Sequence, residues 1–246
     1  MIALLLPLAA ALAATTAPYD HTHAALDALL KAHVADGLVD YAGLKGDRAP
    51  LDTYLATAGA VPVAEFQQWS KDEQLAFLIN VYNAATLQLI IDAYPVDSIK
   101  SLGNLIKSPW SRETVMLFGK KVSLDTVEHG MIRKNYAEPR IHFALVCAAL
   151  GCPPLRDEAY QAARLAEQLD AQAKAFLNDP SKNRVDMEKQ VVWLSPIFKW
   201  YGDDFTSGGG TLLSYVAPHM GLDAPSAYSI KYTNYDWSLN VQGASR

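Results

Sequence analysis

The longest apolar segment of the sequence after residue 20 is SKDEQLAFLINVYNAATLQLIIDAYP, residues 70–95. Ser70 and Glu73 have the spacing of a capping box, which predicts a helix that begins directly after the serine. Pro95 has no backbone N–H, so it predicts the end of that helix. Apolar residues lie on nearly every face between these limits, which is typical of a helix in the centre of a domain. We therefore expect a buried central helix over residues 71–94.

Two amides interrupt this apolar helix. Asn80 and Asn83 are one helical turn apart and share a face. A buried amide without a hydrogen-bond partner costs about 1–3 kcal/mol, so both side chains must find partners. They are candidate binding residues beside the central helix.

The rest of the sequence predicts a mixture of helices and strands. We expect a hairpin around Gly119-Lys120, strands over residues 140–146 and 190–194, and partly β-like structure over 228–239. Apolar periodicity predicts helices over residues 22–34, 123–136 and 158–177. The fold class is α+β: a mainly helical single domain with a small antiparallel β-sheet around the buried central helix.

The N-terminal residues predict export. MIALLLPLAAALA, residues 1–13, is apolar and ends in Ala-Leu-Ala, which fits a signal peptide cleaved after Ala13. We expect residues 14–21 to be a flexible mature N-terminus and residues 22–246 to form one globular domain. The mature protein would be periplasmic or secreted, without stable membrane insertion after cleavage.

Composition restricts the partners. The 246 residues carry a net charge of −5, half of them are hydrophobic, and no Lys/Arg cluster stands out. These properties argue against a nucleic-acid partner and leave an unknown small molecule or peptide.

Residues 123–133 contain the first candidate site. Glu128 lies between apolar positions of its helix, where a carboxylate would have a raised pKa suited to acid–base chemistry. His129 and Arg133 are four residues apart on the next face. The alternative is a structural ion pair between Glu128 and a basic residue elsewhere, such as Arg140.

Cysteine chemistry is the second candidate. Cys147 could act as a nucleophile with His142 or His129 as its base. In an oxidising compartment, however, Cys147 and Cys152 are expected to pair, which would exclude that role in the oxidised form. The same His, Cys and Glu side chains could hold zinc, but their spacing matches no standard zinc pattern. We expect no metal and no cofactor.

Several ordered motifs resemble one known family. They are LAFLINVYNAATL (75–87), SLDTVEHGMIR (123–133), PRIHFALVCAALGCPPL (139–155), WLSPIFKWYGDDF (193–205) and YDWSLN (235–240). Together they resemble the bacterial and plant family known as domain of unknown function 547. The family itself implies no settled activity. It directs attention to the motif residues that core packing explains poorly: Asn80, Asn83, Glu128, His129, Arg133, Arg140, His142, Cys147 and Asp236.

Two hypotheses for function remain open. In the first, the protein is a hydrolase or acyl-transfer enzyme of papain-like or transglutaminase-like type, with Cys147 as nucleophile. His129 or His142 would be its base, and Glu128, Asn80 or Asn83 would orient that base. In the second, the protein is a non-catalytic binding or scaffold protein, and the polar residues form a satisfied buried network.

Overall fold

The computed structural model describes residues 18–104 and 107–243. The predicted signal peptide, residues 1–13, lies outside these residues. Tyr19, within the segment expected to be flexible, packs against Trp69 and Phe77. The helices are α1 (Ala24–His33), α2 (Tyr41–Gly46), α3 (Ala49–Gly59), α4 (Val63–Phe66), α5 (Lys71–Ala93), η1 (Ile99–Leu102), η2 (Pro109–Ser111), η3 (Thr126–Arg133), α6 (Ile141–Ala144), η4 (Ala162–Arg164), α7 (Leu165–Leu177), α8 (Ile197–Trp200), α9 (Gly202–Thr206), α10 (Leu212–Met220) and η5 (Pro225–Ala227).

The strands form small separate sheets. They are β1 (Val34–Ala35), β2 (Leu38–Val39), β3 (Glu113–Leu117), β4 (Lys120–Ser123), β5 (Arg184–Asp186), β6 (Val191–Leu194) and β7 (Ser229–Tyr232). β1–β2, β3–β4 and β5–β6 pair antiparallel, and β7 adds to β6 in parallel. The predicted α+β class, mainly helical with small antiparallel sheets, is confirmed.

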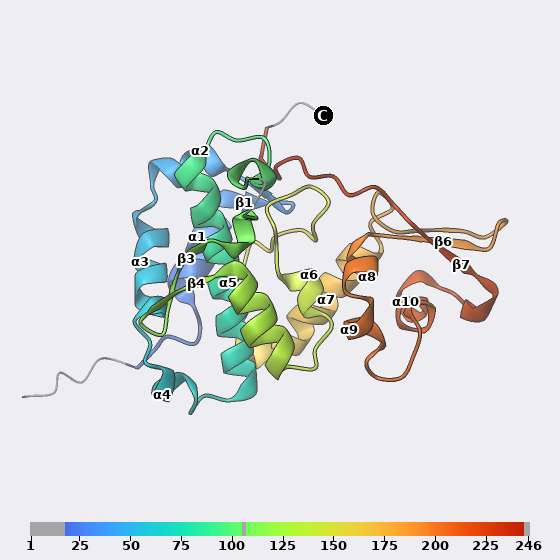
Figure 1. Cartoon of the computed structure of the whole chain (residues 1–246), viewed down its shortest axis with the longest axis horizontal. Coiled ribbons are helices and arrows are strands. Elements are labelled where there is room, and N and C mark those ends of the chain that lie inside the picture. Colours follow the sequence, from blue (N-terminus) through green and yellow to red (C-terminus); the bar gives the residue numbers. More distant parts are fainter. Residues whose placement is uncertain (1–17, 105–106, 244–246) are drawn as a thin grey trace, which may run out of the picture.

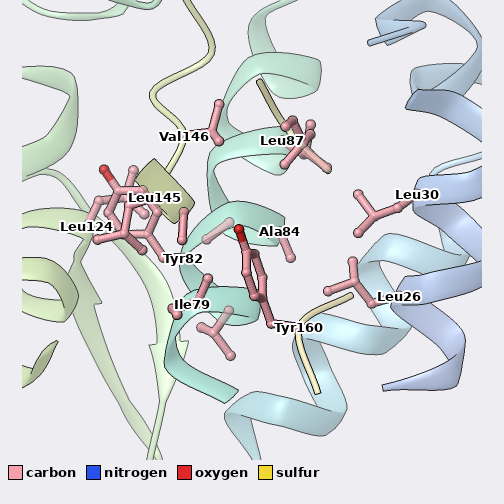
Figure 2. Packing of buried hydrophobic residues seen from close by; sticks show 14 of the residues in the cluster. Leu26, Leu30, Ile79, Tyr82, Ala84, Leu87, Leu124, Leu145, Val146 and Tyr160 are labelled. Atoms are coloured by element: carbon pink, nitrogen blue, oxygen red, sulfur yellow. The ribbon is translucent and has the colours of Figure 1, made fainter. Parts of the chain in front are cut away.

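The predicted central helix is α5, and its capping box is present. Ser70 accepts from the Glu73 backbone N–H, and the Glu73 side chain accepts from the Ser70 N–H. α5 packs against α2, α3, η3 and η4. Figure 2 shows Leu26 and Leu30 of α1 on one side of α5 and Leu124 and Leu145 on the other. By length and composition α5 could cross a membrane, but 94% of its most apolar window is buried in the fold, as in other core helices.

The buried apolar residues form two clusters. The first surrounds α5, and the second lies between α7, β6, α8 and α10, which Figure 1 shows at the opposite end of the molecule from α3. The short helix α6 joins them, because Ile141 and Ala144 belong to the first cluster and Phe143 to the second. The junction of the two clusters is where the candidate site lies.

Residues 140–146 correct one prediction. The sequence predicts a strand here, but Ile141–Ala144 is the helix α6. Pro139 precedes it, and the Pro139 carbonyl accepts from the His142 N–H to close the first turn. All four residues of α6 are buried, so the sequence lacks the amphipathic period that distinguishes a helix from a strand.

Two predicted helices also differ in detail. The helix expected over residues 158–177 begins only at Leu165, because the Gln168 side chain binds the Gln161 N–H and the Ala159 carbonyl and holds that segment extended. The helix expected over residues 123–136 is a π-helix between Thr126 and Arg133. Short π-segments are frequent at functional sites.

Both central amides bind backbone groups. Asn80 donates to the Tyr160 carbonyl (2.7 Å) and accepts from the Tyr160 N–H (2.9 Å). Asn83 donates to the Ala144 carbonyl (2.9 Å) and accepts from the Val146 N–H (2.9 Å). Asn83 thus fastens the end of α6, and the chain leading to Cys147, to the middle of α5.

We expect Asn83→Ala to destabilise the fold. The substitution leaves the buried Val146 N–H and Ala144 carbonyl without their partner, so the free energy of unfolding should fall by about 2–4 kcal/mol. Urea unfolding measures this change. The control Asn178→Ala, which removes an exposed hydrogen bond to the Lys174 carbonyl, should stay within about 1 kcal/mol of the parent. A similarly small change for Asn83→Ala would contradict the assigned role.

Candidate functional site

A cavity of about 250 Å³ lies at the junction of the two clusters. Its residues come from α5, η2, η3, α6, α8 and the cysteine and C-terminal loops. They are Tyr82, Trp110, Asp125, Glu128, His129, His142, Leu145, Cys147, Cys152, Pro153, Ile197, Trp200, Tyr201, Tyr235 and Trp237. We call it the aromatic cavity. All four residues predicted to be catalytic, Glu128, His129, His142 and Cys147, line it.

The π-helix η3 places Glu128 and His129 at the cavity. Glu128 is buried, and its Oε2 accepts from the Tyr82 hydroxyl at 3.2 Å. The side chain of His129 is 45% exposed, and its Nδ1 lies 3.8 Å from Glu128 Oε1. Arg133 Nη1 lies 3.1 Å from the same Nδ1. A guanidinium can only donate, so His129 Nδ1 is the acceptor in this contact.

His142, in the cavity wall, binds the carboxylate of Asp204, which lies behind that wall on α9. His142 Nε2 lies 2.7 Å from Asp204 Oδ2, and the His142 side chain is only 2% exposed. Arg133 binds the same carboxylate with two hydrogen bonds, Nε to Oδ2 at 2.6 Å and Nη2 to Oδ1 at 2.9 Å. Asp204 therefore joins η3 and α6 to α9.

The charges of this pair follow from their surroundings. The Arg133 hydrogen bonds lower the pKa of Asp204 to about 2. Burial lowers the pKa of His142 to about 4, against the opposing effect of Asp204. At neutral pH the carboxylate is ionised and the imidazole is neutral, so the Nε2–H donates to Asp204. Among the described residues, His142 Nδ1 has no hydrogen-bond partner and is left as an acceptor.

Tyr201 lies between these groups. Its ring stacks on His142 with centroids 3.9 Å apart, and the Arg133 guanidinium lies 5.0 Å from its centroid. Burial, together with the negative charge of Glu128, raises the pKa of Tyr201 far above its usual value. The hydroxyl therefore remains protonated.

The predicted Cys147–Cys152 disulfide is present. The Cys147 N–H donates to Cys152 Sγ at 3.1 Å. The Tyr235 hydroxyl lies 3.1 Å from each sulfur. Because a disulfide carries no proton, the hydroxyl is the donor to both. In this form Cys147 is not a free nucleophile.

Aromatic rings cover the side of the cavity around the disulfide. Tyr235 packs on Trp237 at 4.6 Å and on Trp200 at 4.9 Å between ring centroids. Trp110 meets Trp237 at 5.9 Å. These rings give the cavity an apolar lining in addition to its carboxylate and imidazole groups, a combination typical of ligand pockets.

The other predicted site residues lie outside the cavity. Asn80 and Asn83 bind backbone groups, as described above. Arg140 pairs with Glu138 and with Asp170, at 2.6 Å from the latter, and not with Glu128. Asp236 is exposed at a second groove, where its backbone binds Gly151. A Cβ on Gly151 would lie 2.8 Å from the Asp236 nitrogen, so this close approach requires glycine.

Asp204, Tyr201, Tyr235 and Tyr82 were not predicted as site residues. Asp204 and Tyr201 lie in the motif WLSPIFKWYGDDF, and Tyr235 lies in YDWSLN. Their position as acidic or aromatic residues within family motifs is the feature of the sequence that could have identified them. The sequence could not show that Asp204, and not Asp203, faces the imidazole. Within residues 18–104 and 107–243, no group of three or more His, Cys, Asp or Glu side chains could hold a metal ion.

Stability should fall in acid because of His142. The unfolded imidazole protonates near its ordinary pKa of 6.5, whereas the folded one protonates only near 4. The unfolded state therefore binds more protons between these values, and stability is lost as the pH falls from 6.5 to 4, by up to about 3 kcal/mol. His23, whose pKa burial also lowers to about 4, adds a similar loss.

Thermal unfolding between pH 4 and 8 measures this effect. We expect His142→Gln to flatten the acid slope by roughly half, since His23 retains its share. The control His219→Gln, outside the cavity on α10, should keep the parental slope. An unchanged slope in His142→Gln would show that the imidazole is not held neutral by the fold.

Comparison with known proteins gives one match. Residues 66–177 match the family described as "Protein of unknown function, DUF547", which confirms the resemblance predicted from the sequence. The matched region contains α5, η3, α6 and both cysteines, whereas Tyr201, Asp204 and Tyr235 follow it. No curated protein and no solved structure matches the chain.

Proposed function

From the DUF547 match of residues 66–177 and the cavity built around them, we propose that this protein is an exported cysteine–histidine hydrolase or acyl-transfer enzyme. One observation carries the proposal. Cys147 and His142 line the same aromatic cavity, and Asp204 fixes the imidazole of His142. The likeness to papain-like or transglutaminase-like enzymes is one of side-chain roles.

The proposed roles follow from the protonation states. After reduction of the disulfide, Cys147 provides a thiol at the cavity wall. His142 accepts its proton at Nδ1, and the Asp204 carboxylate at 2.7 Å offsets the charge that forms on the ring. The thiolate attacks an acyl carbon, the leaving group departs with a proton from the imidazolium, and water or a second nucleophile releases the acyl group.

The cavity suggests the kind of substrate. Its volume of about 250 Å³ fits a small molecule or a single side chain of a peptide, and its tryptophan and tyrosine rings favour an apolar or ring-bearing group. Glu128 and Asp125 add negative charge to one wall. The net charge of −5 favours neither nucleic acid nor an anionic membrane as a partner.

Export is part of the proposal. The apolar run of residues 1–13 and the cysteine pair support a periplasmic or secreted location. A disulfide formed there makes the oxidised form the resting state, and catalysis requires its reduction.

The test is acylation of the reduced protein by a panel of p-nitrophenyl esters. We expect release of nitrophenol and an acyl adduct on Cys147, found by mass spectrometry. Cys147→Ser should abolish the adduct, and His142→Asn should slow acylation roughly 10²- to 10³-fold through loss of the base. His219→Asn is the matched control and should react like the parent.

A second candidate is a non-catalytic binding or scaffold protein. Two observations favour it. The two sulfurs are bonded to each other, and the Arg133 guanidinium and the Asp204 carboxylate are hydrogen-bonded to each other. If Cys147 in the reduced parent and in His142→Asn reacts at the same rate as an unfolded cysteine, the catalytic proposal fails. Non-covalent binding of a ligand in the aromatic cavity would then be the remaining function.

A further inference from the structure

The two sulfurs of the cavity disulfide differ in access. Cys147 is partly exposed, whereas Cys152 is only 3% exposed. Both line the aromatic cavity, and Cys152 also borders a second groove lined by residues such as Gly37, Gly151 and Asn240. Attack on a disulfide requires approach to one sulfur, so access favours Cys147.

One hydrogen-bond donor distinguishes the two sulfurs and favours Cys152 as the leaving group: the Cys147 N–H donates to Cys152 Sγ, whereas the Tyr235 hydroxyl lies equally close to both sulfurs. Cys152 Sγ accepts the Cys147 N–H at 3.1 Å and shares the Tyr235 hydroxyl with Cys147, also at 3.1 Å. Hydrogen bonds to an ionised acceptor are about twice as strong as those to a neutral one. Both donors therefore strengthen if charge develops on Cys152, and a stabilised thiolate leaves faster.

Tyr235 is held in place to supply this hydrogen bond. Its ring packs against both Trp200 and Trp237. Burial raises the pKa of Tyr235 far above its usual value, so the hydroxyl keeps its proton beside a thiolate. The N–H of Cys147 is fixed as well, because Asn83 binds the neighbouring Val146 N–H.

We propose that the Cys147–Cys152 disulfide undergoes thiol–disulfide exchange with an external dithiol that enters the aromatic cavity. Cys147 is the attacked sulfur and Cys152 the leaving thiolate. This activity is distinct from acyl transfer, since it requires only the disulfide and its two donors.

The steps balance as a two-electron transfer. A thiolate of the dithiol attacks Cys147 Sγ, forming a mixed disulfide and breaking the Cys147–Cys152 bond. The electron pair leaves on Cys152 Sγ, which the Tyr235 hydroxyl and the Cys147 N–H stabilise. The second thiolate of the dithiol then attacks the dithiol sulfur that is bonded to Cys147. Cys147 departs as a thiolate, the dithiol is oxidised to a cyclic disulfide, and its two protons pass to the two cysteines.

The first test traps the mixed disulfide on the unaltered protein. The folded protein is mixed with glutathione, quenched with acid, alkylated and mapped by mass spectrometry. We expect glutathione on Cys147 and the alkyl group on Cys152. Glutathione on Cys152 would overturn the assignment and indicate attack from the second groove.

The second test measures the rate of reduction by dithiothreitol. We expect the rate for the folded protein to rise linearly with dithiothreitol concentration. A rate that levels off at the rate of global unfolding would overturn the proposal, because exchange would then require unfolding. A negative result with esters would not affect this measurement, so the two proposals fail separately.

The Tyr235→Phe variant tests the leaving-group donor. We expect reduction roughly threefold to tenfold slower than in the parent, because Cys152 loses one of its two donors. Tyr232→Phe, which removes a hydroxyl outside the cavity lining, is the control and should react at the parental rate. Melting temperatures of both variants are measured alongside. An unchanged rate in Tyr235→Phe would overturn the role given to its hydroxyl.

Discussion

The candidate site depends on the pair of hydrogen bonds from Asn83. This side chain, in the middle of the buried helix α5, holds the carbonyl of Ala144 and the N–H of Val146. It thereby fixes where α6 ends and where the chain turns toward Cys147. A polar side chain inside an apolar helix is unfavourable unless all its polar atoms are hydrogen-bonded. Here the two hydrogen bonds that meet this need of Asn83 also position the chain that follows α6.

Electrostatics add a second set of ties across the junction. Asp204 of α9 binds Arg133 of η3 and His142 of α6, so one carboxylate connects three segments far apart in the sequence. The bidentate guanidinium keeps the carboxylate ionised, and the ionised carboxylate orients a neutral imidazole. This arrangement occupies Nε2 of His142 and leaves its Nδ1 without a partner among the described residues.

Much of this could be predicted from the sequence, and the exceptions have physical causes. The capping box and Pro95 located α5, and the two cysteines indicated their own bond. The family motifs predict Glu128, His129, His142 and Cys147 as site residues, and these four line one cavity. The apolar periodicity of the sequence could not predict the helix α6, because a short helix that is buried on all sides has no amphipathic pattern. Asp204 was missed because its partners, Arg133 and His142, lie more than 60 residues away.

The loop closed by the disulfide also borders two pockets of the molecule, the aromatic cavity and the second groove. Cys152 and Pro153 border both the aromatic cavity and the second groove. An occupant that contacts Cys152 in either pocket therefore contacts the disulfide-closed segment. If one occupant binds more tightly to a particular shape of this segment, thermodynamic linkage requires the other occupant to be favoured or opposed to the same degree. The two pockets thus share a wall at Cys152 and Pro153, through which molecules bound in them can affect each other's affinity.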